Sequence, residues 1–148
     1  PVIQAESDGD WEVYSVKKAT KTNRLVTTKD VTIEGSYSGA AWSQDGPTMT
    51  DEFKAALVPG SSIVVDYTSA TGEIWLVFPD SAAGWMRVGV GDFDGSGQGY
   101  MAYDGSHAEI TYEQIAEILG DDVSTWGGRI QCEATSNWEI YSISVGQR

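Results

Sequence analysis

A strand–turn–strand pattern over residues 72–92 constrains this chain more than any other feature of its sequence. Two short apolar runs, 73–78 and 85–90, alternate in the direction of their side chains, and Pro-Asp-Ser at 79–81 stops the first run. Alternation with a period of two predicts β-strands that each bury one face. The pattern therefore predicts a hairpin, and we expect the rest of the chain to act as its scaffold.

The second run of this hairpin places a tryptophan and an arginine on one sheet face. Met86 and Val88 alternate with Trp85 and Arg87, so the apolar pair can close a core while the other pair points outward. The residues before Trp85 are Ala-Ala-Gly, which leave its ring uncrowded. A flat apolar ring beside a planar hydrogen-bond donor suits a sugar, which has an apolar C–H face and a polar rim. The outward face is therefore a candidate sugar-binding surface.

Charge excludes several classes of partner. The chain has 148 residues, a length typical of one domain, and carries 22 acidic and 9 basic side chains, a net charge of −13. Nucleic acids and anionic membranes require a basic footprint, so neither is expected as a partner. Neutral ligands or basic partners remain, and we expect a monomer.

Other sequence features bear on domain organisation. Cys132 is the one cysteine, so no intrachain disulfide forms, and its strand-like setting predicts a buried, inert thiol. No run of 18 apolar residues is present to span a bilayer. The sequence starts with Pro-Val, which fits a module of a longer polypeptide. We expect a linker remnant over 1–10 and a single domain over 11–146.

Eight or nine short strands with frequent turn signals predict an all-β fold, a two-sheet antiparallel β-sandwich (jelly roll) with one short α-helix. That helix is expected over 111–119, because Thr111 and Gln114 have the spacing of a capping box. Residues 51–57 can form a further short helix after Thr50. Loops are expected over 35–46 and around His107, and a turn at 29–30. The remaining strands are expected over 11–16, 24–34, 62–68, 100–103, 129–133 and 138–145.

Three of the six tryptophans are expected to be open to a ligand. Trp42, Trp85 and Trp126 each have small neighbours (Ala-Ala, Ala-Gly and Gly-Gly), and each lies at a strand edge or in a loop. A binding tryptophan needs space over its ring, whereas a core tryptophan needs bulky neighbours. We expect at least two of the three to form a platform for a ligand. The other three, Trp11, Trp75 and Trp138, lie inside strands and are expected to pack.

Polar candidates accompany this platform. Arg87, Arg129 and Gln131 take outward strand positions and can donate to sugar hydroxyls, and Gln44 and Tyr103 complete the candidate ligand-binding set. An alternative stays open for the arginines, since each can instead pair with one of the many carboxylates.

Catalysis and metal binding are weaker interpretations of the same sequence. Glycoside hydrolysis needs two carboxylates across the scissile bond, and no acidic side chain has a distinctive setting. The outward-facing candidates are Glu73, Asp66, Glu133 and Glu139.

The stretch that starts at Asp92 and Asp94 resembles the beginning of a calcium loop, but Tyr103 stands where an EF-hand carries its bidentate glutamate. A structural calcium at Asp92 and Asp94 is an alternative; no cofactor or catalytic residue is expected.

Several segments together resemble a known family. They are G-A-A-W, A-A-G-W-M-R, the late helix I-T-Y-E-Q-I-A-E-I-L-G and the closing W-E-I-Y-S-I-S-V. They are similar to non-catalytic carbohydrate-binding modules of bacterial plant-cell-wall-degrading enzymes, in particular the β-glucan-binding families 65 and 79 of cellulosomal glycoside hydrolases. The resemblance covers residues 11–145. It implies a β-sandwich whose cleft tryptophans stack on sugars, and Trp42, Trp85 and Trp126 fit that role.

The function expected from residues and resemblance together is binding of internal stretches of β-1,4- and mixed-linked glucan, with xyloglucan as a further ligand. The module would hold a catalytic module of the same secreted, extracellular polypeptide on the plant cell wall. A small jelly-roll glycoside hydrolase and a protein-interaction module of a cellulosome are the alternatives.

Overall fold

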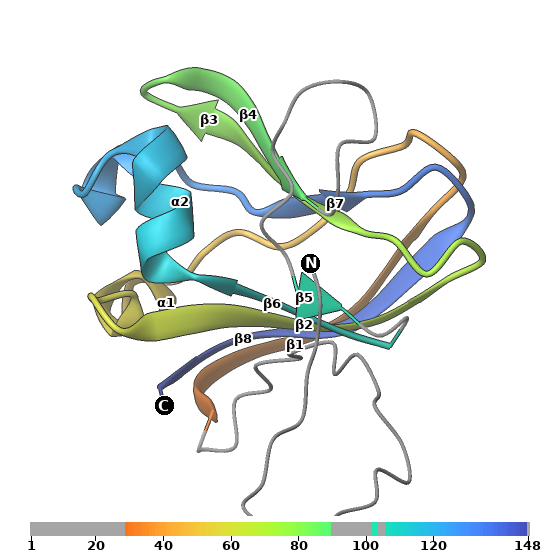
Figure 1. Ribbon diagram of the computed structural model, residues 1–148, viewed down its shortest axis with the longest axis horizontal. Coiled ribbons are helices and arrows are strands. Elements are labelled where there is room, and N and C mark those ends of the chain that lie inside the picture. Colours follow the sequence, from red (N-terminus) through yellow and green to blue (C-terminus); the bar gives the residue numbers. More distant parts are fainter. Residues whose placement is uncertain (1–28, 90–101, 104–105, 148) are drawn as a thin grey trace, which may run out of the picture.

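Two antiparallel sheets packed face to face form the body of the protein (Figure 1). The computed structural model describes residues 29–89, 102–103 and 106–147, without the side chains of residues 29, 89, 102 and 103. The larger sheet has five strands in the order β1-β8-β2-β6-β5, and the smaller has three in the order β4-β3-β7. The predicted fold class, an antiparallel β-sandwich, is confirmed. The strands are β1 (Lys29–Gly39), β2 (Ser61–Ser69), β3 (Trp75–Ser81), β4 (Gly84–Gly89), β5 (Ala102–Tyr103), β6 (His107–Thr111), β7 (Gln131–Glu133) and β8 (Trp138–Gln147).

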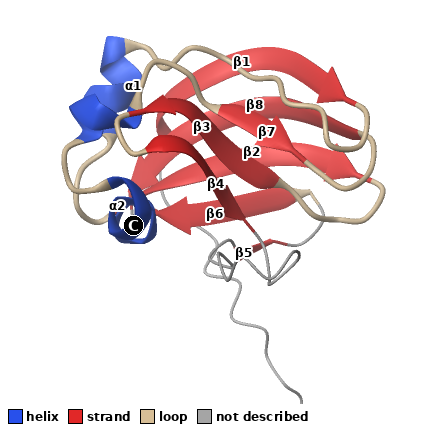
Figure 2. Cartoon of the chain, turned by 90° about the horizontal axis from the view of Figure 1, so that it is seen from above, coloured by secondary structure: helices blue, strands red, loops and turns tan. Residues whose placement is uncertain are grey.

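Helices cover one end of the sandwich. Figures 1 and 2 show α1 (Asp51–Ala56) and α2 (Tyr112–Leu119) at the same end, with a 3-10 turn, η1 (Val123–Trp126), after α2. Both helices start where the sequence predicts, because Thr50 and Thr111 accept hydrogen bonds from backbone N–H groups of the first turn. Neither helix is long and apolar enough to cross a membrane, and no other α-helix occurs in the described part of the chain.

The core lies between the sheets and is built by alternation. Ile63 and Val65 of β2 are fully buried on the inner side of the large sheet, and Leu76 and Phe78 of β3 are buried on the inner side of the small one. Cys132 of β7 joins this core, as expected, and burial raises the pKa of its thiol, which keeps it protonated and inert.

Four sequence expectations about local structure are wrong. Residues 35–39 continue β1 instead of forming a loop, and no turn separates 29–30 from the strand. Strand β1 pairs with β8 from Lys29 to Gly39, with register shifts at 29–31 and 34–37. His107 begins β6, where its backbone pairs with Asp66 of β2. Pro79 does not end β3, because it lies in a register shift and takes no partner in β4 or β7.

Loss of the Thr111 cap is expected to lower stability. The Thr111 hydroxyl accepts from the Gln114 N–H at 3.2 Å, and the Gln114 side chain accepts from the Thr111 N–H at 3.0 Å. Thr111→Ala should therefore reduce the free energy of unfolding by about 1 kcal/mol in urea titrations. Thr48→Ala, an exposed loop substitution, is the control. Equal effects for the two variants would contradict the capping role.

Candidate functional site

The outer face of the small sheet collects aromatic and charged side chains. Because β3, β4 and β7 are antiparallel and aligned, alternate residues project together on the side away from the core. Trp85 and Arg87 come from β4, Trp75 from β3, and Glu133 from β7, where it pairs directly with Trp75. Trp42 reaches the same face from the loop after β1.

Two indoles of this face are exposed and a third is covered. Trp42 is 54% exposed and Trp85 is 48% exposed, whereas Trp75 is buried. The Trp42 ring lies over Trp75 with 5.7 Å between ring centroids, and the guanidinium carbon of Arg87 lies 4.3 Å from the Trp75 ring centroid and 5.9 Å from that of Trp85. Arg87 therefore lies between two indoles, a favourable cation–π arrangement.

The backbone of Trp42 has an unusual conformation. Its φ of 65° lies in the left-handed region, which bulky residues rarely adopt and which costs on the order of 1–3 kcal/mol. Its N–H donates to the carbonyl of Ala134 at 2.8 Å, which ties the loop to the residue that follows β7. Such strain persists only where surrounding contacts maintain it. Here the hydrogen bond to Ala134 maintains the backbone conformation that places the Trp42 indole over Trp75.

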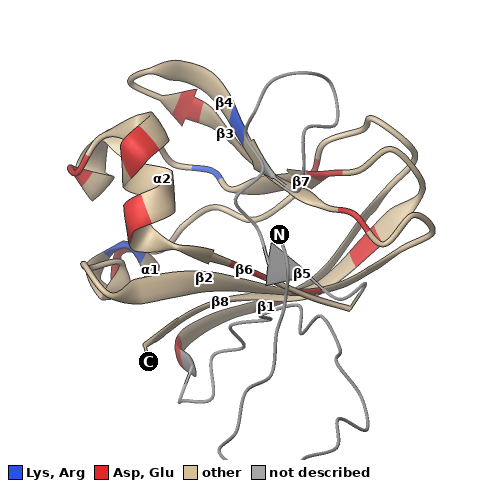
Figure 3. Cartoon of the chain, in the orientation of Figure 1, with Lys and Arg blue, Asp and Glu red and all other residues tan. Residues whose placement is uncertain are grey.

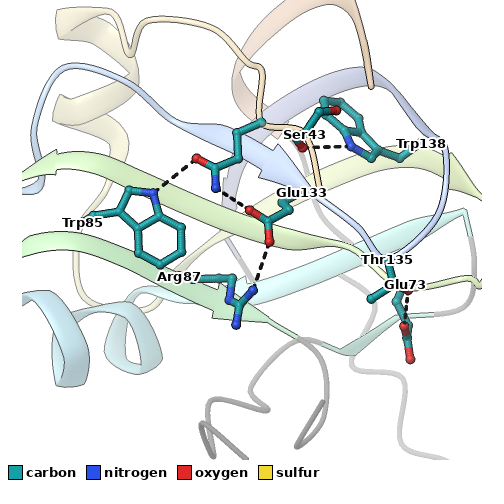
Figure 4. A network of polar contacts seen from close by, with 8 residues as sticks. Ser43, Glu73, Trp85, Arg87, Glu133, Thr135 and Trp138 are labelled. Atoms are coloured by element: carbon teal, nitrogen blue, oxygen red, sulfur yellow. Dashed lines mark hydrogen bonds and ion pairs between the residues drawn. The ribbon is translucent and has the colours of Figure 1, made fainter. Parts of the chain in front are cut away.

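A chain of hydrogen bonds connects the exposed Trp85 ring to a buried carboxylate (Figure 4). The indole N–H of Trp85 donates to the side-chain oxygen of Gln44 at 3.2 Å. The amide of Gln44 donates in turn to Glu133 Oε2, and Arg87 donates to Glu133 Oε1 at 3.0 Å. Only 4% of the Glu133 side chain is exposed. A buried carboxylate needs this kind of charge-assisted pairing, and the Trp85 ring is fixed in orientation as a result.

Arg129 is also paired with a carboxylate. Its Nε and Nη2 each donate to Asp80 at 2.7 Å, a bidentate geometry. Hydrogen bonding to Arg129 lowers the pKa of Asp80, and the same contact raises the pKa of Arg129. Arg87 and Arg129 thus both pair with carboxylates, as in the alternative that the sequence leaves open, and donation to a sugar stays a prediction. Figure 3 marks the positions of the acidic and basic residues along the described chain.

The expectation that Trp126 is open to a ligand is wrong. Its side chain is 0% exposed, and its indole N–H donates to the carbonyl of Gly120 at 2.9 Å. Its ring packs edge-on against Phe78, with 6.0 Å between ring centroids, and against Tyr112, with 5.5 Å between ring centroids. The glycine that follows it, Gly127, is needed for the backbone: it has a φ of 93°, and a Cβ there would come within 2.7 Å of the Asp80 backbone. Trp126 is therefore a core residue at the helix end of the sandwich.

The other predicted site residues divide into two groups. Gln131 is half-buried on β7, two residues before Glu133 and on the same side of the strand. Tyr103 belongs to β5 of the other sheet, and its side chain is outside the described part of the structure. Asp92 and Asp94, the calcium candidates, also lie outside the described residues. Within residues 29–89, 102–103 and 106–147, no group of three acidic, histidine or cysteine side chains could hold a metal ion.

The roles of Trp75 and Glu133 are not evident from the sequence. The expectation that Trp75 packs is confirmed, but it packs beneath Trp42 on the outer face instead of in the core. The sequence offers Glu133 only as a candidate catalytic carboxylate, whereas its oxygens are engaged by Arg87 and Gln44. The feature that reveals both roles is the pairing of Glu133 with Trp75 across β7 and β3. It depends on the strand register, which cannot be read from the sequence.

Comparisons with known proteins define the class of this chain as a carbohydrate-binding module. The chain belongs to the family described as carbohydrate binding module 65 domain 1, whose sequence model matches residues 33–143. The resemblance to carbohydrate-binding modules is thus confirmed, and it makes the chain a non-catalytic, glycan-binding module.

A solved structure is also similar to this chain, that of a carbohydrate-binding module of endoglucanase Cel5A from Eubacterium cellulosolvens. The match has a TM-score of 0.43 and 22% identity, and covers 79% of this chain and 94% of that chain. A search of curated proteins finds no match to this chain.

Truncation of Trp126 is expected to destabilise the fold far more than truncation of an exposed tryptophan. Trp126→Ala should lower the free energy of unfolding by about 3–5 kcal/mol, because it leaves a large cavity in the core. The matched control is Trp85→Ala, for which we expect a loss within about 1 kcal/mol. Urea unfolding followed by circular dichroism measures both, and similar losses would contradict the assignment of Trp126 to the core.

Proposed function

We propose that this module binds internal stretches of β-1,4- and mixed-linked glucan, and xyloglucan, on the outer face of β4-β3-β7. The observation that carries the proposal is that Trp42 and Trp85 present exposed rings on one face, next to polar groups that are already held in place. A β-1,4-linked glucan is an extended, flat chain whose sugar rings can lie on such indoles.

The charge of this face favours a neutral ligand. Arg87 is paired with Glu133, and Arg129 is paired with Asp80, so each of these two cations has a compensating carboxylate. The chain as a whole carries a net charge of −13, which disfavours acidic polysaccharides at long range. A neutral glucan is indifferent to this charge, and its hydroxyls can still bond to Arg87, Gln44 and Gln131.

The expected affinity is modest. Two aromatic platforms and a few hydrogen bonds, less the ordering of the sugar chain, leave about 5–8 kcal/mol, or dissociation constants from about millimolar to micromolar. Binding of this strength suits a module that keeps a linked enzyme near an insoluble substrate, because tethering raises the local substrate concentration. We propose that the linked enzyme is a secreted, extracellular glycoside hydrolase of a cellulosome.

A hydrolase site on this face is not favoured. Retaining and inverting glycosidases need two carboxylates about 5–10 Å apart across the scissile bond. Of the four carboxylates considered above, Glu133 holds Arg87 and Gln44, and Glu73 accepts from Thr135. The other two, Asp66 and Glu139, belong to β2 and β8 of the large sheet.

Removal of either exposed indole is expected to weaken glucan binding strongly. Trp42→Ala and Trp85→Ala should each raise the dissociation constant for cellohexaose by about 30-fold, which corresponds to about 2 kcal/mol for a truncated hot-spot residue. Isothermal titration calorimetry measures the loss, and affinity gels with barley β-glucan, xyloglucan, mannan and xylan give the specificity.

Tyr141 offers a matched control for these variants. It is an exposed aromatic residue, 45% accessible, on β8 of the other sheet. Tyr141→Ala should leave cellohexaose binding unchanged. Unretarded migration of the wild-type protein in every glucan gel would refute the proposed function, and an equal loss in Tyr141→Ala would refute the location of the site.

A further inference from the structure

Glu133 is a buried acid at the centre of the proposed binding face. Its carboxylate is almost fully covered. Its backbone nevertheless pairs with that of Trp75, whose ring lies beneath the exposed ring of Trp42. Both of its oxygens accept hydrogen bonds, one from Arg87 and one from Gln44 (Figure 4). A charge is costly to bury, so a carboxylate retained at such a position calls for a reason beyond packing.

Each donor connects Glu133 to a surface that a ligand would touch. Arg87 lies between the rings of Trp75 and Trp85, and Gln44 accepts from the indole N–H of Trp85. Glu133 itself is too deeply buried to contact a sugar that lies on these rings. It therefore acts through Arg87 and Gln44, and fixes the orientation of both.

The same carboxylate sets the charge that a ligand meets. Arg87 alone would place a positive charge beside the Trp85 ring, where it would attract an acidic sugar. Glu133 places a negative charge 3.0 Å from the guanidinium, and the pair presents little net charge. Because the pair is largely buried, solvent ions screen it less than they would screen a surface pair.

We propose that Glu133 is the positioning residue of this site and that it excludes acidic glycans by cancelling the charge of Arg87. The proposal rests on the proposed function of the same face. The ligand class that follows is neutral glucan without uronic acid units. Neither role requires Glu133 to contact the ligand.

Glu133→Gln tests both roles, because it removes the charge while it keeps nearly the same shape. The two ligands are cellohexaose and a cello-oligosaccharide of the same length whose C6 hydroxymethyl groups are oxidised to carboxylates. We expect the affinity for the neutral ligand to fall about tenfold, since a charge-assisted hydrogen-bond network is lost. The affinity for the acidic ligand should rise severalfold relative to the wild type, and this gain should shrink as salt is added.

Glu109→Gln is the matched control. Glu109 is a glutamate of similar burial on β6, in the other sheet. Its substitution should leave the ratio of neutral to acidic affinity at the wild-type value. A general loss of stability would affect both ligands alike, whereas the change of ratio is specific to the charge at position 133.

The outcomes separate this inference from the proposed function. If the wild-type protein binds neither ligand, the proposed function fails. If it binds cellohexaose and Glu133→Gln keeps the wild-type ratio, only the inference is overturned. Should Glu133→Gln fail to fold, Arg87→Gln tests the same ion pair by removing its positive charge. It should weaken binding of the acidic ligand more than that of the neutral one, and an unchanged ratio would again overturn the inference.

Discussion

Burial of strand β3 on both of its faces is the constraint on which the site depends. Its inner residues Leu76 and Phe78 belong to the core, while Trp75 and Val77 are equally buried on the outer side. A sheet of only three strands could leave that outer side open to water. Here Trp42 covers Trp75, so the residues that shield β3 are themselves the ones that face solvent. The packing of Trp42 on Trp75 thus buries the outer side of β3 and at the same time leaves the Trp42 ring facing solvent.

Ion pairs hold the two arginines of the small-sheet end of the molecule, Arg87 with Glu133 and Arg129 with Asp80. An arginine between two indoles is well placed to meet a sugar, but as a lone cation it would favour acidic ligands. The buried carboxylate of Glu133 changes this outcome without reaching the surface. Arg129 shows the exposed version of the same arrangement, where Asp80 holds the guanidinium in a bidentate pair. Both arrangements fit a module that recognises shape and hydroxyl groups in preference to charge.

The sequence predicts the sandwich, α2 and the outward pair Trp85 and Arg87 well, because alternation and capping are local signals. It fails for Trp126, whose glycine neighbours resemble those of an open binding tryptophan. Gly127 serves a tight backbone approach to Asp80, a contact between residues far apart in the chain. The importance of Glu133 could not be predicted for a similar reason, since it depends on the strand register and on a loop glutamine, Gln44, that reaches across from another part of the chain.

Tryptophan indole N–H signals, followed by two-dimensional nuclear magnetic resonance during titration with cellohexaose, test the proposed binding face residue by residue. Trp42 and Trp85 have exposed rings, whereas Trp126 and Trp138 are enclosed and donate to backbone carbonyls. We predict that the signals of Trp42 and Trp85 shift together as the sugar is added, while those of Trp126 and Trp138 stay in place. Saturable shifts at Trp126 or Trp138, with Trp42 and Trp85 unmoved, would contradict a binding site on the outer face of the small sheet.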